Sequence, residues 1–312
     1  KRTIRKPEPV TSVDTPSEAL ALSIGEKAKV DVPFMVQLCG KTEQEVTDEL
    51  AGAIFRNPVT QQWETSDEYL SGNVREKLAT AEKFAANHAE YQINVDYLKR
   101  VQPKDLDASE IEVRLGANWV KPEYITQFMK EVFKTPNYYA GIDIKATYSE
   151  ISGAWNISGK SLDRGNPLVT NTYGTMRVNA YKLLEDALNL RDTKIYDTIH
   201  DADGDHRVLN KQETMLAQQA QESIREAFKQ WIFKDLDRRE DLCATYNRIF
   251  NAIRPREYDG SHIRFEGMTP EISLMPHQKN AVAHILYGNN TLLAHCVGAG
   301  KTFQMIAAGM ES

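Results

Sequence analysis

Apolar residues recur at helical spacing along most of this chain, and strict alternation of apolar and polar residues is confined to short stretches. Near the start, capping residues open three short helical stretches. The first begins at Thr15, and the third begins at Thr42, where Glu45 three residues on completes a capping box. An apolar hairpin pattern follows over residues 53–65. Three short helices and a hairpin predict a winged-helix-like module over residues 15–72.

The middle of the chain is predicted to be helical first and mixed afterwards, because alternation appears only after residue 140. In chain order, we predict helices at 16–25, 31–40, 42–50, 74–87, 91–101 and 122–133, two or three antiparallel strands within 141–160, a helix at 177–190, a hairpin over 195–209, helices at 211–234 and 238–253, and a short strand at 262–265.

The last part of the chain carries the most specific chemistry. An apolar run at 291–297 leads into Gly298-Ala299-Gly300-Lys301-Thr302, and a helix-forming stretch follows. This order predicts a strand, a phosphate-binding loop and a helix, in the short G-x-G-K-T form, because His295 stands at the first glycine position of the longer motif. Glycines allow the backbone N–H groups to turn toward phosphate oxygens, and the helix start adds partial positive charge. The alternative is a strand-to-helix turn that merely needs glycines.

Three side chains around this loop have candidate roles. Lys301 stands where an ammonium reaches phosphate oxygens, and Thr302 where a hydroxyl reaches Mg²⁺. Upstream, Gln278 precedes a helical stretch that ends before the loop, and its side-chain amide can donate and accept one hydrogen bond each with adenine. For Gln278 alone, a polar residue at a helix start is the simpler interpretation, and the spacing to the loop favours the adenine reader.

Pro276-His277-Gln278 followed by Gly298–Thr302 resembles the start of a superfamily-two helicase core of the Swi/Snf-like kind. The wider sequence resembles very large bacterial proteins of mobile elements and phages, in which an N-6 adenine DNA methylase module precedes such a helicase module. The segments that carry this second resemblance are Tyr69–Leu78, Val113–Trp119, Tyr173–Tyr181 and Arg254–Gly260.

The resemblance implies an ATP-dependent DNA translocase or helicase-like protein, with a methylase module in the same polypeptide and DNA engaged by the full-length protein. It implies ATP and Mg²⁺ as cofactors, with Mg²⁺ held by Thr302 through the nucleotide. The implied nucleotide-binding residues are Gln278, Gly298, Ala299, Gly300, Lys301 and Thr302. We expect the chain to end just after this first element of the ATPase site, and so to show no ATP hydrolysis by itself, whereas the parent protein would be an ATP hydrolase.

The predicted fold class is therefore α+β and mainly helical. Its predicted parts are a linker at 1–14, the winged-helix-like module at 15–72, a helical region at 73–140, a mixed α/β accessory region at 141–268, and at 269–312 the truncated start of a RecA-like ATPase lobe.

Charge changes the interpretation of the winged-helix-like module. The chain carries a net charge of −6, and the third predicted helix, 42–50, is strongly acidic, so phosphates would repel it. A scaffold or protein-contact role is favoured over DNA reading for this module. Local basic groups are the remaining candidates for nucleic-acid contact, although solvated charge explains them as well: Lys1, Arg2, Arg5 and Lys6, and then Arg238, Arg239, Arg248, Arg254 and Arg256.

Other classes of site are disfavoured. The three cysteines, Cys39, Cys243 and Cys296, are widely spaced, which fits neither a disulfide framework nor a zinc site and favours a reducing cytoplasm. We expect Cys296 to be a small buried residue on a core strand. The aspartates at 201–205 resemble a calcium loop but lack the closing glutamate, so they predict a turn. No apolar run is long enough for a membrane span, and the Pro-Pro-aromatic methylase motif is absent.

Two alternatives stay open. The chain could be a non-catalytic connector that docks a methylase module or a protein partner, with aromatic residues supplying the surface, although core packing explains most aromatic residues. The residues considered for such a surface are Trp63, Trp119, Trp155, Tyr138 and Tyr139. The second alternative is an unrelated phosphate-loop ATPase.

Overall fold

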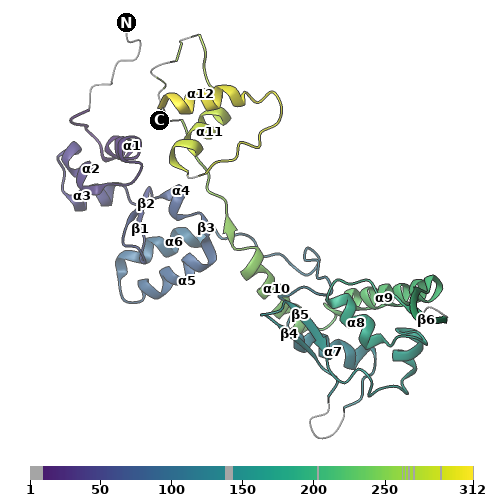
Figure 1. Ribbon diagram of the computed structural model, residues 1–312. Coiled ribbons are helices and arrows are strands. Elements are labelled where there is room, and N and C mark those ends of the chain that lie inside the picture. Colours follow the sequence, from purple (N-terminus) through teal and green to yellow (C-terminus); the bar gives the residue numbers. More distant parts are fainter. Residues whose placement is uncertain are drawn as a thin grey trace. The chain divides into compact units, whose positions relative to one another are not determined.

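The computed structural model describes residues 10–137, 143–201, 204–261, 263, 265, 268–269, 271–288 and 290–311. The chain divides into two compact units, one made of Lys1–Lys104 with Ala252–Ser312, and the other of Asp105–Asn251. The sequence predicted module boundaries after residues 14, 72, 140 and 268. These divide the chain more finely than the two units do, and they stay predictions. Figure 1 shows the helices and strands of both units.

The first unit opens with three short helices and a hairpin. They are α1 (Pro16–Lys27), α2 (Val32–Cys39), α3 (Glu43–Glu49), β1 (Ile54–Arg56) and β2 (Trp63–Thr65), and the two strands pair antiparallel. Their shared core contains Ala19, Met35, Val46 and Ile54. Val13 also packs against this core and its N–H donates to Leu38, so the predicted linker joins the module before residue 14.

The predicted caps are confirmed at the start of these helices. Thr15 and Glu18 form a reciprocal capping box on α1, and Thr42 and Glu45 form the second one on α3. The bonds from Thr42 also lower the pKa of Glu45, because they stabilise its carboxylate. Asp31 caps α2 by accepting from the N–H of Phe34. Local capping chemistry thus fixes where each helix begins.

A small helical layer follows the hairpin in the same unit. It contains α4 (Ser66–Tyr69), β3 (Gly72–Asn73), α5 (Val74–Ala85), the 3-10 turn η1 (Ala89–Tyr91) and α6 (Gln92–Arg100). The aromatic ring of Phe55 from β1 stacks on Tyr69 and ties the hairpin to this layer. Strand β3 pairs antiparallel with β8 (Ile253–Arg254), which joins residues distant in the sequence. Ile253 is therefore in a strand, and the prediction that a helix continues to residue 253 was wrong.

The last part of this unit is a pair of helices, α11 (Pro276–Tyr287) and α12 (Lys301–Glu311), which pack side by side (Figure 1). The predicted strand at 291–297 is not formed, so a RecA-like lobe is not confirmed. Among the described residues no strand pairs with this segment, and an unpaired strand leaves its backbone groups to solvent. Leu292 and Val297 are 86% and 98% exposed, and Cys296, expected to be buried, is exposed as well.

The second unit is built around a large core. Its helices are α7 (Pro122–Val132), α8 (Ala180–Leu188), α9 (Lys211–Trp231) and α10 (Leu236–Phe250), with a π-helical turn η2 (Leu168–Thr172). Two antiparallel hairpins complete it, β4 (Ala146–Ser149) with β5 (Ala154–Ile157), and β6 (Tyr196–Asp201) with β7 (Gly204–Leu209). Phe128 stands at the centre of the core, where its ring contacts those of Phe133, Phe228 and Trp231 edge-on.

Helix α8 begins three residues later than the pattern predicted. Asn179 is its N-cap and accepts from the N–H of Lys182, while the Thr175 hydroxyl accepts from Arg177 and Val178 in a preceding turn. A side-chain cap therefore stops the helix from extending back to residue 177. The hairpin predicted over 195–209 is confirmed by β6 and β7, although Ala202 and Asp203 at its tip lie outside the described residues, as do His262 and Arg264 of the strand predicted at 262–265.

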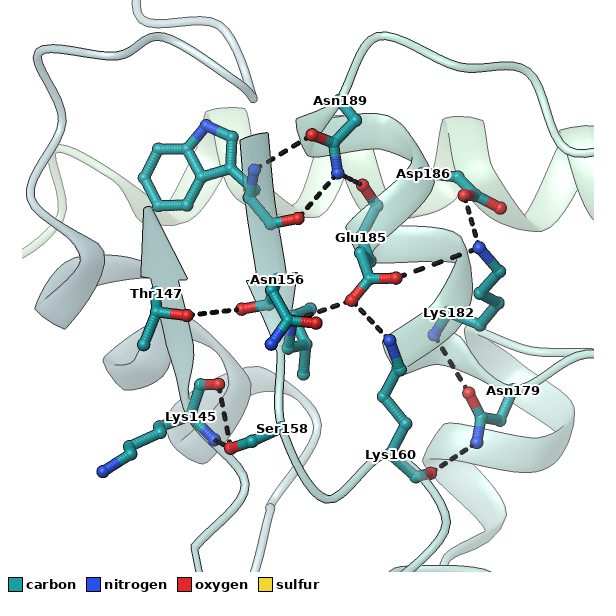
Figure 2. A network of polar contacts seen from close by, with 12 residues as sticks. Lys145, Thr147, Asn156, Ser158, Lys160, Asn179, Lys182, Glu185, Asp186 and Asn189 are labelled. Carbon is teal, nitrogen blue, oxygen red and sulfur yellow. Dashed lines mark hydrogen bonds and ion pairs between the residues drawn. The ribbon is translucent and has the colours of Figure 1, made fainter. Parts of the chain in front are cut away.

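A polar network joins the β4–β5 hairpin to α8 (Figure 2). Glu185 accepts from the N–H of Ile157 at 2.8 Å and from Lys160 Nζ at 2.5 Å. Asn189 completes the junction by bonding both the N–H and the carbonyl of Trp155. Burial alone would raise the pKa of Glu185, but Lys160 and the Ile157 N–H outweigh it and hold that pKa below its ordinary value.

The described part of the chain contains no candidate for a membrane span or for a metal site. None of its helices combines the length and apolar character needed to cross a bilayer. Among the described residues, no three or more histidine, cysteine, aspartate or glutamate side chains lie close enough together to hold a metal ion.

Candidate functional site

The loop between α11 and α12 has the backbone of a site for an anion. Gly298 and Gly300 adopt φ of +88° and +75°, in the left-handed region that favours glycine. The first hydrogen bond of α12 runs from the N–H of Gln304 to the carbonyl of Gly300, at 3.2 Å. The N–H groups of Lys301, Thr302 and Phe303 therefore have no acceptor within the helix, which leaves a run of donors at its positive end.

Lys301 is folded back over this loop. Its Nζ donates to the carbonyl oxygens of His295 at 2.9 Å and Cys296 at 3.0 Å. These oxygens are acceptors of the same kind as phosphate oxygens, so the ammonium already occupies a position where oxygen ligands converge. Within the predicted loop, 298–302, the side chain of Lys301 thus turns back toward His295 and Cys296, which precede the loop.

Gln278 contacts the loop directly, with both ends of its side chain engaged. Oε1 accepts from the N–H of Met275 at 2.9 Å, within the first turn of α11, and Nε2 donates to the carbonyl oxygen of Ala299 at 3.2 Å. Reading adenine would require Gln278 to share or release these bonds. Its role as adenine reader stays a prediction, and the contact with Ala299 is what the structure adds.

Three further side chains belong to the site: His277 and His295, to which sequence reasoning gave no role, and Gln304, which it missed. His277 Nε2 and Gln304 Nε2 each lie 3.2 Å from the same Ala299 oxygen, and His295 Nδ1 lies 3.0 Å from Gln304 Oε1. Gln304 is fully buried. A sequence signal existed, because Gln304 stands one helical turn after Gly300 on the α12 face that also carries the buried Ala307 and Ala308.

The residues present fit a phosphate group. Glycines in left-handed conformation, consecutive N–H donors and an ammonium are the donor set that phosphate oxygens require. Thr302 is exposed at the second position of α12, where its hydroxyl is free of the core. The ligands of a Mg²⁺ ion would be this hydroxyl and oxygens of the bound phosphates.

Helix α11 is held in place by contacts upstream. The ring of Tyr258 stacks on His284 with centroids 4.2 Å apart. The Arg256 guanidinium lies over the Tyr258 ring, 4.7 Å from its centroid. Arg256 also donates to Asp67 at 2.8 Å. These contacts connect the site to α4 of the same unit.

The basic groups considered for nucleic-acid contact are largely engaged in the chain. Arg238 is buried and donates to the carbonyls of Trp231 and Ile232, Arg254 donates to Leu70, and Arg256 pairs with Asp67. Arg239 and Arg248 are exposed. Lys1, Arg2, Arg5 and Lys6 lie outside the described residues. Of these five arginines, Arg239 and Arg248, both in the second unit, thus stay candidates for nucleic-acid contact.

The aromatic residues considered for a docking surface are mostly part of the cores. Trp155 is 4% exposed, and Trp63 and Trp119 pack against the cores of their own units. Tyr138 and Tyr139 lie outside the described residues.

The acidic helix α3 borders a cavity. A cavity of about 840 Å³ lies between α3, the β1–β2 hairpin and α6. Its apolar lining includes Ile54, Phe55 and Tyr91, and Glu43, Asp48 and Glu90 stand exposed among its polar lining residues. Arg56 is its single cationic lining residue.

Comparison with known families finds two matches. Residues 12–64 match the family described as "Probable helicase, winged helix domain", which agrees with the winged-helix-like module predicted and observed at this position. Residues 114–252 match a "Domain of unknown function (DUF8437)", which covers most of the second unit. No curated protein and no solved structure matches the chain.

Proposed function

We propose that residues 298–302 bind the phosphates of ATP, and that the chain is part of an ATP-dependent DNA translocase or helicase-like protein. The observation that carries this proposal is the run of N–H donors at the start of α12, together with the Lys301 ammonium, which folds back onto the carbonyl oxygens of His295 and Cys296 in the same loop. The match of residues 12–64 to a winged helix domain of a probable helicase supports the helicase part.

Lys301, the N–H groups at the start of α12 and the Thr302 hydroxyl have separate tasks in phosphate binding. Lys301 exchanges the carbonyl oxygens of His295 and Cys296 for phosphate oxygens. The N–H groups at the start of α12 orient the phosphate, and the Thr302 hydroxyl holds Mg²⁺ through the nucleotide. Bound ATP supplies the phosphoanhydride whose hydrolysis drives movement, and the chain's residues contribute positioning and charge.

DNA is the proposed macromolecular substrate of the full-length protein, with the methylase module of the resemblance as its neighbour in the same polypeptide. Helix α3 does not suit direct base reading. Its exposed Glu43, Glu45, Asp48 and Glu49 would meet phosphates of the same sign. DNA contact is therefore assigned to parts of the protein other than α3.

The experiment is a titration of the protein with ATP by isothermal calorimetry, in Mg²⁺ buffer. Saturable binding is expected, and Lys301→Ala should weaken it about tenfold or more, since a charge-assisted bond is lost at the phosphate. Lys211→Ala is the matched control, because Lys211 is also the first residue of a helix, α9, and is exposed. Equal affinities of the wild type and Lys301→Ala, or no saturable binding by the wild type, would contradict the proposal.

A second candidate function is protein docking by the winged-helix-like part, and the cavity beside α3 favours it. An apolar floor with three carboxylates and one arginine around it is complementary to a peptide that carries lysine or arginine next to an apolar residue. The occupant proposed is such a basic segment of a partner protein.

This candidate is tested with a fluorescent peptide of alternating lysine and leucine. The double variant Glu43→Lys, Asp48→Lys should abolish its binding, whereas Glu49→Lys on the same helix, outside the cavity lining, should leave it unchanged. Equal binding by both variants would refute the docking site. Tight binding of duplex DNA that the double variant strengthens would show instead that α3 faces nucleic acid.

A further inference from the structure

Three side-chain donors converge on one backbone oxygen of the phosphate loop. His277 Nε2, Gln278 Nε2 and Gln304 Nε2 each lie 3.2 Å from the carbonyl oxygen of Ala299. Two donors come from the first turn of α11, and the third comes from the first turn of α12. One donor is enough to satisfy the carbonyl oxygen of a half-buried residue such as Ala299, so three protein donors on this oxygen indicate that its direction is fixed.

The direction of this oxygen decides the direction of a donor in the loop. A trans peptide group is planar, and its carbonyl oxygen and N–H point in opposite directions. When the three donors hold the Ala299 oxygen on their side, the N–H of Gly300 points away from them. This N–H directly precedes the N–H groups of Lys301, Thr302 and Phe303. None of these three has an acceptor within α12.

Gln304 is itself fixed by a second bond. Its Oε1 lies 3.0 Å from His295 Nδ1, so the amide presents Nε2 to Ala299, and Oε1 accepts from the His295 Nδ1–H. Its side chain is fully buried, where an amide with an unpaired end would be costly. His277 must likewise carry its proton on Nε2 to donate to Ala299. The two histidines and the two glutamines therefore form one connected set around the loop.

We propose that Gln304, His277 and Gln278 are positioning residues that clamp the Ala299 carbonyl and thereby aim the Gly300 N–H at a bound phosphate group. The inference rests on the proposed phosphate-binding function of this loop. It assigns Gln278 a task at the phosphate side of the nucleotide, in place of adenine reading. The ligand class is any polyphosphate, with or without a base.

The test compares ATP with inorganic tripolyphosphate, which has the phosphates and lacks adenine. Gln304→Met keeps the volume and removes the donor, and His277→Ala removes an exposed side chain, so its fold should be unaffected. Each is expected to weaken binding of both ligands about three- to tenfold, as the loss of one oriented hydrogen bond implies. Gln278→Ala should weaken both ligands by the same factor. Gln221→Met is the control, since Gln221 is an equally buried glutamine of the second unit.

The outcomes separate this inference from the function on which it rests. If Lys301→Ala loses tripolyphosphate binding but Gln304→Met and His277→Ala bind as tightly as the wild type, the clamp is refuted and the phosphate site stands. A loss for Gln278→Ala that appears with ATP alone refutes the clamp role of Gln278 and restores the adenine reader. If Lys301→Ala has no effect, the phosphate site itself is refuted. Thermal unfolding midpoints equal to that of the wild type show that each variant is folded.

Discussion

The α-carbon of Gly300 lies against the side-chain amide of Gln278. A Cβ added to Gly300 would stand 2.2 Å from Gln278 Nε2, and the φ of Gly300 is +75°. Gly300→Ala must therefore displace Gln278 and also adopt a left-handed conformation that costs an L-residue about 1–2 kcal/mol. We expect this variant to lose at least about tenfold in affinity for tripolyphosphate, measured by calorimetry, because loop and clamp shift together.

Gly298→Ala is the matched control for this prediction. Gly298 also has a positive φ, +88°, but a Cβ there would meet no atom within 4 Å. It carries the conformational cost alone, so its loss of affinity should be clearly smaller than that of Gly300→Ala. Equal losses for the two variants would mean that the contact with Gln278 does not matter.

Cys296 offers a chemical probe of the same loop. It is exposed, whereas Cys39 and Cys243 are partly buried, and burial raises the pKa of the Cys243 thiol. Since the thiolate is the reactive form, Cys296 should react first with a maleimide or with Ellman's reagent. The expected result is one fast phase that Cys296→Ser removes and Cys39→Ser leaves in place. A fast phase that survives in Cys296→Ser would show that Cys39 or Cys243 is the most reactive thiol, which would contradict the prediction.

How far the sequence predicts this fold depends on the range of the interactions involved. Helix starts were predicted well where the cap was recognised, because a cap is local, as at Thr42 with Glu45 and at Asn210, which accepts from the N–H of Glu213. The strand predicted at 291–297 failed because an apolar run forms a strand only where a neighbouring strand accepts its hydrogen bonds. The pairing of Gly72 with Arg254 joins distant segments, and no local pattern marks it.

The candidate site shows the same division between local and long-range information. The glycines at 298 and 300 and the lysine that follows could be located from the sequence, because their spacing along the chain is the motif. The convergence of His277 and Gln304 on Ala299 could not, because it depends on how α11 packs against α12. Single polar residues such as these look like ordinary helix-surface positions until the packing is known.

Glu185 should make the second unit sensitive to acid. Its pKa is held below the ordinary value of 4.5, since Lys160 and the Ile157 N–H outweigh the effect of burial. A depressed pKa in the folded state means that the stabilisation is complete above the unfolded pKa and is lost as the pH falls through the folded pKa. Glu185→Gln should lower the free energy of unfolding by about 1–3 kcal/mol at pH 7 and by less in acid.

The measurement is urea unfolding followed by tryptophan fluorescence, because Trp119, Trp155 and Trp231 of the four tryptophans belong to this unit. Glu150→Gln is the control, since Glu150 is an exposed carboxylate at the turn between β4 and β5. A Glu185→Gln variant whose stability deficit stays constant from neutral to acid pH would refute the assigned role of its charge.

Arg238 should act as a structural residue of the second unit. It is 2% exposed, Nε donates to Ile232 at 2.8 Å, Nη2 donates to Trp231 at 3.0 Å, and the guanidinium carbon lies 3.6 Å from the centre of a Trp231 ring. Burial lowers its pKa, against the opposing charges of Glu131 and Asp235, so the charge is retained at a desolvation cost.

Arg238→Met keeps the apolar stem and removes both donors, which leaves two carbonyl oxygens at the end of α9 without these partners. We expect a loss of about 2–4 kcal/mol in the free energy of unfolding, measured by urea titration. Arg239→Met tests the neighbouring exposed arginine and should change stability by less than about 0.5 kcal/mol. Arg238→Lys should also destabilise the protein, since one ammonium cannot reproduce the planar fork of donors. If Arg238→Met unfolds at the same urea concentration as Arg239→Met, the buried guanidinium adds nothing net, and its desolvation cost cancels its two hydrogen bonds and its contact with Trp231.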